Sequence, residues 1–222
     1  MQTFTQQHPV FDPATSLFVV WLFPNDLFNY SATGQLPGTA LGAAGGPGTV
    51  EQLIGNGVGN ILSTVGYLAS LGAKHFLVPN LPDIGKTPSY VGTPAEAQMT
   101  ALSSAFNSYL GQWLTLLDTA LTPAEIVQFD TFGVLNRILA NPGAYGFEVT
   151  DKACVYNLGY EPGQCNPGNW DKWVFWDLAH PTTSAHALLG QEFAASVPEP
   201  GTLFLLAIAL LGVAASRRRV VR

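Results

Sequence analysis

Residues 17–23, LFVVWLF, indicate the fold more strongly than any other stretch of the chain. The stretch is wholly apolar and rich in β-branched and aromatic side chains. A strand without polar alternation is buried on both faces, which is typical of a parallel sheet covered by helices on either side. Residues 17–23 therefore predict a buried strand in an α/β domain.

Further strand-like segments follow at helix-length intervals. Short buried strands are predicted at residues 75–80 (HFLVPN) and 126–130 (IVQFD), and a short extended segment at 173–176 (WVFW). Residues 31–48 are rich in Gly, Ala and Pro and are expected to form a loop. Strands that alternate with helices predict a parallel sheet with helices on its faces.

The intervening helices carry start and stop signals. Thr49 with Gln52 predicts a capping box, and Gly72 can end that helix in a left-handed conformation. Residues 93–96 (TPAE) predict a second capping box, with Pro94 at the first helical position.

This second helix is expected to bury one apolar stripe, whose aromatic residues belong to the core. The stripe comprises Met99, Leu102, Phe106, Tyr109, Leu110, Trp113, Leu114 and Leu117. Shorter helices are predicted at residues 132–140 and 181–195.

Charge and cysteine content narrow the class of protein. Residues 1–196 carry 14 acidic and five basic side chains, a formal charge of −9, which argues against nucleic-acid binding. Cys154 and Cys165 are too few for a zinc site on their own, so they form either a loop-closing disulfide or two unrelated thiols. We favour the disulfide, which implies an oxidising, exported compartment.

The last 26 residues differ from the rest of the chain. They contain VPEP at 197–200, an uncharged apolar run at 202–215 and the basic segment SRRRVVR. A 14-residue run makes a helix of about 21 Å, short for a hydrocarbon core of about 30 Å. The alternative is a helix buried in the protein core, but such a helix would carry a polar face, and this run has none.

These three parts, in this order, resemble the PEP-CTERM sorting signal of exported Gram-negative bacterial proteins. The resemblance implies recognition by an exosortase-type enzyme. It also implies passage through the inner membrane by way of residues 202–215, and then the cell surface or the medium. Residues 1–196 would form one domain and residues 197–222 the sorting signal. Residues 1–30 contain no secretory signal peptide, so we expect the native polypeptide to begin upstream of Met1.

Residues 175–182, FWDLAHPT, contain a candidate catalytic pair. Asp177 lies three residues before His180, after a strand-like segment and before a predicted helix. A carboxylate that accepts the imidazole Nδ1 proton leaves Nε2 free to act as a general base. The same spacing is also compatible with a surface acid and a helix-capping histidine.

Four segments follow one another along the chain: SLFVVWLFPNDLFNY, GAKHFLVPNLPDIGKTP, NPGAYGFEVTDKAC and KWVFWDLAHPTTSAH. Together they resemble the GDSL (SGNH) hydrolases, especially their phospholipase and haemolysin-like branch. The resemblance implies a three-layer α/β/α flavodoxin-like fold and cleavage of carboxylic esters, including lipid esters. It assigns Asp177 and His180 to the catalytic triad and Asn25 to the oxyanion hole. It implies no metal and no organic cofactor.

The chain departs from this family in two ways. Phe23 stands where the family motif has glycine, and neither a GDS nor a G-x-S-x-G setting surrounds a serine of residues 1–196. By resemblance, the nucleophile block and the central first strand would lie upstream of Met1. The strand at residues 17–23 would then be an uncovered edge.

We therefore expect the C-terminal part of an exported ester hydrolase that lacks serine-dependent activity by itself. The alternative is a non-catalytic exported surface or matrix protein that retains the hydrolase scaffold for binding.

Overall fold

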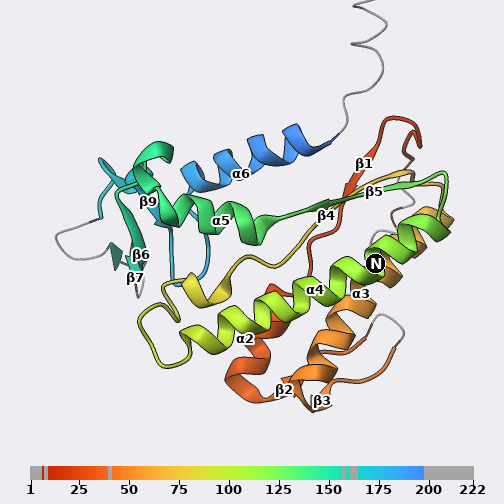
Figure 1. Ribbon diagram of the computed structural model, residues 1–222, viewed down its shortest axis with the longest axis horizontal. Coiled ribbons are helices and arrows are strands. Elements are labelled where there is room, and N and C mark those ends of the chain that lie inside the picture. Colours follow the sequence, from red (N-terminus) through yellow and green to blue (C-terminus); the bar gives the residue numbers. More distant parts are fainter. Residues whose placement is uncertain (1–6, 8–9, 40–41, 157–158, 161–164, 198–222) are drawn as a thin grey trace, which may run out of the picture.

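The computed structural model describes residues 7, 10–39, 42–156, 159–160 and 165–197. Its main sheet is parallel, in the order β1-β4-β5, and lies between two layers of helices (Figure 1). The strands are β1 (Leu17–Val19), β4 (His75–Pro79) and β5 (Glu125–Phe129). The covering helices are α3 (Val50–Ser70) and α4 (Glu96–Ala120) on one side, and α5 (Thr131–Ala140) and α6 (Thr183–Ser196) on the other (Figure 1). This arrangement confirms the α/β/α fold class.

Smaller elements complete the described chain. A parallel pair joins β6 (Val149–Ala153) to β9 (Trp173–Phe175). Antiparallel pairs join β2 (Gln35–Leu36) to β3 (Gly46–Pro47) and β7 (Val155–Tyr156) to β8 (Gly159–Tyr160). The remaining elements are α2 (Pro24–Thr33), η1 (Ile84–Lys86), η2 (Pro142–Tyr145) and η3 (Trp170–Lys172). The expected loop at residues 31–48 therefore includes the end of a helix and a small β-ladder.

Two apolar clusters lie on opposite faces of the main sheet. Phe76 and Val78 of β4 pack into the cluster with α3 and α4, whereas Leu77 packs into the cluster with α5 and α6. Successive side chains of a strand point to opposite faces, so β4 contributes to both clusters. The predicted buried strand at residues 75–80 is thus confirmed as β4, in which residues 76–79 are buried and His75 is partly exposed.

Strand β1 is shorter and more exposed than the sequence predicts. It ends at Val19, and the side chains of Leu17 and Val19 are 42% and 52% exposed. Within the described residues β1 pairs with β4 alone and forms one edge of the sheet. The prediction of burial on both faces is wrong, because Leu17 and Val19 point to the same face of the sheet and both are exposed. The expectation of an edge position is confirmed among the described strands.

The capping box of α3 forms as predicted. The Gln52 N–H donates to Thr49 Oγ1 over 3.3 Å, and the Thr49 N–H donates to Gln52 Oε1 over 2.9 Å. Gly72 follows the helix with φ +100°, a conformation that suits glycine.

The predicted capping box of α4 is wrong, because α4 begins at Glu96 itself. Glu96 turns back to an ion pair with Lys86 and accepts the Gly92 N–H over 2.7 Å. Thr93 Oγ1 donates to the Tyr90 carbonyl over 2.6 Å, and Pro94 precedes the helix. These carboxylate contacts hold the turn before α4 against η1 instead of capping the helix.

The apolar stripe of α4 is narrower than predicted. Its buried members are Met99, Leu102, Phe106, Leu110 and Leu114, which recur every three or four residues. Tyr109 and Trp113 are 40% and 43% exposed, so placing them in the core was wrong. Each precedes a buried residue by one position, about 100° around the helix.

The two helices of the other layer are confirmed within two residues of the predicted boundaries, as α5 and α6. The predicted helix at residues 202–215 lies outside the described residues. No helix in the described part of the chain is both long and apolar enough to cross a membrane.

Candidate active site

Asp177 and His180 form a hydrogen-bonded pair in the loop between β9 and α6. His180 Nδ1 lies 2.9 Å from Asp177 Oδ2 and 3.0 Å from Oδ1. The backbone N–H groups of Ala179 and His180 also donate to Oδ1, over 2.8 and 2.7 Å. Since Asp177 engages Nδ1, Nε2 is the ring nitrogen left to exchange a proton with a substrate.

These contacts keep the Asp177 carboxylate ionised. Burial alone would raise its pKa, but the hydrogen bonds from the His180 and Ala179 backbone, and then the His180 side chain, hold the pKa below the usual value of an aspartate. An ionised Asp177 stabilises the imidazolium that forms when His180 takes up a proton.

Backbone contacts fix the loop that carries the pair. The Trp176 N–H donates to the His180 carbonyl over 2.7 Å, which closes the loop on itself. Thr182 then caps α6, because its Oγ1 accepts the Ala185 N–H, and the same hydroxyl donates to the Trp173 carbonyl over 2.7 Å. The position of the pair is therefore determined by β9 and by the first turn of α6.

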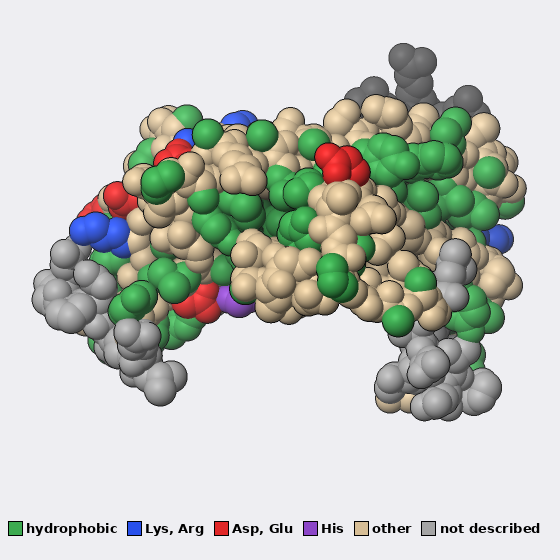
Figure 2. Space-filling model, turned by 90° about the horizontal axis from the view of Figure 1, so that it is seen from below, with side chains coloured by type: hydrophobic (Ala, Val, Ile, Leu, Met, Phe, Trp, Pro, Cys, Tyr) green, Lys and Arg blue, Asp and Glu red, His purple; other side chains and the backbone are tan. Residues whose placement is uncertain are grey.

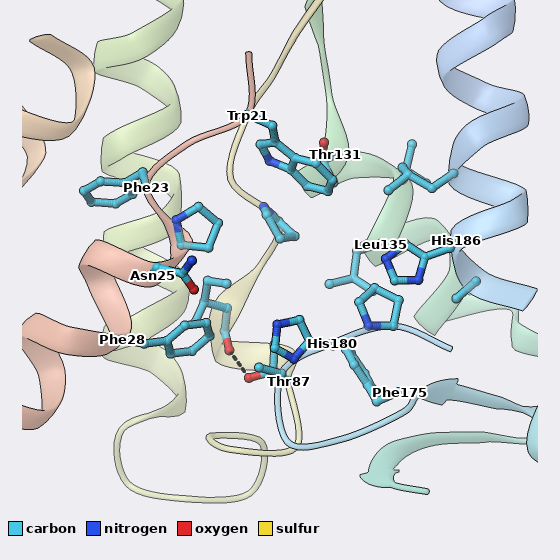
Figure 3. Close-up of a pocket in the computed structure, with 18 of the residues that line it drawn as sticks. Trp21, Phe23, Asn25, Phe28, Thr87, Thr131, Leu135, Phe175, His180 and His186 are labelled. Atoms are coloured by element: carbon cyan, nitrogen blue, oxygen red, sulfur yellow. Dashed lines mark hydrogen bonds between the residues drawn. The ribbon is translucent and has the colours of Figure 1, made fainter. Parts of the chain in front are cut away.

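His180 lies at a cavity of about 550 Å³ that is also lined by Asn25. Asn25 and Phe28 of α2 lie on one side of this main cavity, and His180, Leu135 and His186 lie across it (Figure 3). Most other lining residues are apolar: Trp21, Leu22, Phe23, Pro24, Ile84, Val134, Ile138, Val174, Phe175 and Leu189. In space-filling form, hydrophobic side chains gather across the middle of one face, where a histidine and an acidic side chain are also adjacent (Figure 2).

Phe23 adopts the backbone conformation that a glycine would take without strain. Its φ is +98°, and it immediately precedes α2. The ring is 3% exposed and stacks on Phe106 of α4 at a centroid distance of 3.9 Å. Figure 3 shows the ring directed away from His180. Phe23 therefore buries its ring in the core while the turn presents Asn25 to the main cavity.

Neighbouring polar residues have other roles. Burial raises the pKa of Asp26, which also lines the main cavity. Asn80 Nδ2 donates to Asp130 Oδ1 over 2.9 Å, and Asn80 Oδ1 accepts the Phe132 N–H over 2.9 Å. Asp130 also accepts the Gly133 N–H, so Asn80 and Asp130 organise the start of α5 and line a different, smaller cavity. Asn80 and Asp130 therefore line a different cavity from Asn25 and His180.

No serine lines the main cavity among the described residues. The hydroxyls there belong to Thr87, which donates to the Ile84 carbonyl over 2.8 Å, and to Thr131, whose Oγ1 is buried without a described partner. Within the described part of the chain, neither hydroxyl is hydrogen-bonded to His180. Nor does that part contain a group of three or more His, Cys, Asp or Glu side chains suited to a metal ion.

Sequence reasoning missed His186 and a second cavity. His186 Nδ1 lies 3.1 Å from the Thr182 carbonyl in the first turn of α6, and the side chain lines both cavities. The second cavity, of about 520 Å³, is lined by Asp177 and His180 together with Trp170 and Trp176. Helical spacing from Thr182 could have placed His186 beside the loop, but nothing in the sequence joins Trp170 to Trp176.

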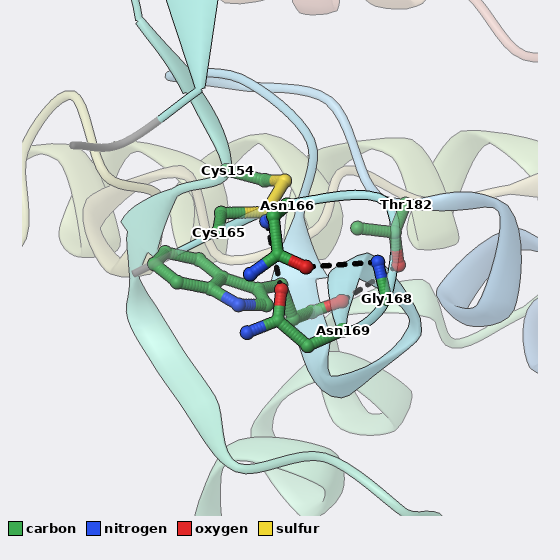
Figure 4. The surroundings of a disulfide bond; sticks show 7 residues. Cys154, Cys165, Asn166, Gly168, Asn169 and Thr182 are labelled. Atoms are coloured by element: carbon green, nitrogen blue, oxygen red, sulfur yellow. Dashed lines mark hydrogen bonds between the residues drawn. A yellow bond between two sulfur atoms is a disulfide. The ribbon is translucent and has the colours of Figure 1, made fainter. Parts of the chain in front are cut away.

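Cys154 and Cys165 form a disulfide, with Cα atoms 5.2 Å apart and both residues buried beside Trp173 (Figure 4). The following turn is held by Asn166 and Asn169: the Asn166 N–H donates to Asn169 Oδ1 over 2.8 Å. The disulfide thus ties the segment that leads to Trp170 against β9.

Comparison with known proteins identifies the family. Residues 1–193 match the GDSL-like Lipase/Acylhydrolase family, and residues 196–219 match the PEP-CTERM protein-sorting motif. A GDSL esterase/lipase of Arabidopsis thaliana is 29% identical over 157 residues, which cover 65% of this chain and 43% of the relative. Another from the same plant is 32% identical over 144 residues, 57% of this chain and 41% of the relative.

An uncharacterized protein from the trpE-trpG intergenic region of Pseudomonas putida is 31% identical over 144 residues, 61% of this chain and 23% of that protein. The chain spans less than half the length of these relatives. Its fold, its Asp–His pair and the match over residues 1–193 agree: the chain belongs to the GDSL-like lipase/acylhydrolase family and carries a PEP-CTERM sorting motif.

Proposed function

We propose that this chain provides the general base and an oxyanion donor of a serine ester hydrolase, with carboxylic esters, including lipid esters, as substrates. The observation that carries this proposal is the Asp177–His180 pair, joined through Nδ1 over 2.9 Å, at an apolar cavity that Asn25 also lines. Apolar walls with a few polar groups suit a substrate that has an acyl chain and one reacting carbonyl.

The reaction would proceed through an acyl-enzyme. His180 Nε2 takes the proton of a serine hydroxyl as the serine oxygen bonds to the ester carbonyl, and Asp177 stabilises the resulting imidazolium. The Asn25 side-chain amide donates to the oxyanion, a contact typically worth about 3 kcal/mol. His180 then protonates the departing alkoxide, and a water activated by the same imidazole releases the acid.

We further propose that the nucleophilic serine comes from polypeptide outside these residues. The support is that no described serine lines the main cavity and that no described hydroxyl is bonded to His180.

The decisive experiment assays the chain with a short-chain nitrophenyl ester, alone and joined to the in-frame polypeptide encoded upstream. We expect hydrolysis only from the joined form, lost in His180→Ala and blocked by an active-serine phosphonate. His75→Ala is the matched control, since His75 lies on β4 beside Glu125 and outside the site. Phosphonate-sensitive hydrolysis by the chain alone, abolished by His180→Ala, would show that the serine lies within it.

The absence of a described hydroxyl partner for His180 also favours a second candidate, a non-catalytic exported protein that binds through the same scaffold. A joined form that folds but hydrolyses no ester would favour this alternative.

For the tail, we propose export from a Gram-negative cell, with residues 202–215 holding the chain in the inner membrane until an exosortase-type enzyme cuts near residues 197–200. The PEP-CTERM match at residues 196–219 supports this step. Fractionation of cells that express an epitope-tagged chain tests it: Glu199→Ala is expected to retain the uncut form in the membrane fraction. Equal release of both forms would contradict the proposal.

A further inference from the structure

The second cavity adjoins the Asp177–His180 pair and has a different lining from the main cavity. Its volume is about 520 Å³, and its walls comprise Trp170, Trp176, Asp177, His180, Pro181, Thr182, Thr183, Ser184 and His186. His180, Pro181 and His186 line both cavities, whereas Asp177 lines only the second. Asp177 therefore adjoins a second cavity whose remaining walls differ from those of the main cavity.

Two tryptophans form the aromatic part of this space. The rings of Trp170 and Trp176 lie 6.1 Å apart at an interplanar angle of 67°, an edge-to-face arrangement. The two residues remain 42% and 36% exposed, so a solute can reach their rings. The face of an indole carries negative electrostatic potential and attracts cations that come within about 6 Å of the ring centre.

The local charge also favours a cation. When His180 is neutral, the Asp177–His180 pair carries one negative charge, and the backbone N–H groups of Ala179 and His180 hold that charge on the carboxylate. None of the described residues that line this cavity is a lysine or arginine. The formal charge of −9 over residues 1–196 adds an attractive long-range field.

We propose that the second cavity binds a quaternary ammonium group, such as that of choline, between Trp170, Trp176 and Asp177. Methyl groups contact the indole faces, while the positive charge interacts with the rings and the carboxylate. The described residues here form no group of three or more side chains suited to a metal ion, and the negative charge of Asp177 would repel an anion. The ammonium group belongs either to the headgroup of a lipid or to a free choline ester, and the two are separated below.

Binding is tested on the intact chain by titration calorimetry with choline chloride. The neutral analogue 3,3-dimethylbutan-1-ol has the same shape without the charge and is titrated in parallel. Trp170→Ala and Trp176→Ala remove one ring each, and the corresponding phenylalanine variants restore a smaller ring. Trp113→Ala is the matched control, because Trp113 is a similarly exposed tryptophan on α4, paired with Tyr109.

We expect choline to bind and the neutral analogue to bind at least roughly five-fold more weakly, because cation–π contacts require the charge. Each alanine variant raises the choline Kd by roughly five-fold or more, each phenylalanine variant by less, and Trp113→Ala leaves it unchanged. The proposal would be overturned if the neutral analogue bound as tightly as choline, or if neither alanine substitution changed the Kd for choline. Near-ultraviolet circular dichroism identifies any variant that has lost its fold, and the phenylalanine variants then decide.

Vesicles separate the two sources of the ammonium group. The amount of protein that sediments with vesicles is measured for phosphatidylcholine and for phosphatidylglycerol. If more protein sediments with phosphatidylcholine, and choline reduces that amount, the site binds lipid headgroups. Choline binding without this lipid preference assigns it to a free choline ester. The readout throughout is binding, so a failure of the proposed serine chemistry leaves this result unaffected and the two failures remain distinguishable.

Discussion

At position 23, the variant with glycine should be more stable than the variant with alanine, which is the opposite of the order expected inside a helix. Because φ is +98° at position 23, a residue with a Cβ atom is strained there, whereas glycine is not. Both substitutions remove a ring that is 3% exposed and stacked on Phe106, at an expected cost of about 3–5 kcal/mol in the free energy of unfolding. Alanine retains the penalty and glycine relieves it, so Phe23→Gly should be the more stable of the two by about 1 kcal/mol.

Phe106 provides the matched control, because it is the other half of the same ring stack and lies inside α4. In a helix interior glycine is less favourable than alanine by about 1 kcal/mol, so Phe106→Gly should be less stable than Phe106→Ala. Urea unfolding of the four variants, followed by far-ultraviolet circular dichroism, measures both differences. If glycine were the less stable residue at position 23 as well, the argument that the backbone there suits glycine would be refuted.

Three further predictions concern charge, the disulfide and the sheet edge. The folded structure lowers the pKa of Asp177 from its usual value, so its contribution to stability is complete above the unfolded-state pKa and is lost as the pH falls through the folded-state pKa. Urea unfolding across this range should show a weaker pH dependence for Asp177→Asn. Replacing Cys154 and Cys165 together by alanine should lower the free energy of unfolding by about 2–3 kcal/mol, from the entropy of an opened loop, measured by the same assay. Leu17→Lys should reduce self-association in sedimentation velocity more than Leu71→Lys. Leu17 lies on β1, which is an edge strand among the described strands, while Leu71, 45% exposed, follows α3. Equal effects of the two substitutions would contradict a contact made through the strand edge.

The sequence predicted correctly those elements of the fold that are determined by residues close together in the chain. The apolar run of β4 and the Thr49–Gln52 capping box behave as expected because local composition matches their surroundings. Strand β1 does not, since its exposure depends on which strands are present beside it. In α4, Glu96 binds Lys86 instead of completing a capping box, a choice that the sequence between them does not reveal.

In the candidate site, too, some features could be predicted from the sequence and others could not. Asp177 and His180 could be predicted because they share one short loop, which sets their geometry locally. The cavity between Trp170 and Trp176 could not be predicted, because η3 and β9 bring the two rings together. The role of Asn25 remains a prediction, although the structure places it at the same cavity as His180.

The buried ring of Phe23 also constrains a residue on another helix. A Cβ added at Gly57 of α3 would collide first with the Phe23 ring and then approach Phe106. Gly57 is therefore required by its partner, and not by its own backbone, which lies in a regular helix. Relatives that keep glycine at the position of Phe23 have no ring to accommodate there. Across the family, these two positions are expected to covary, with larger residues at the Gly57 position only where the Phe23 position is small.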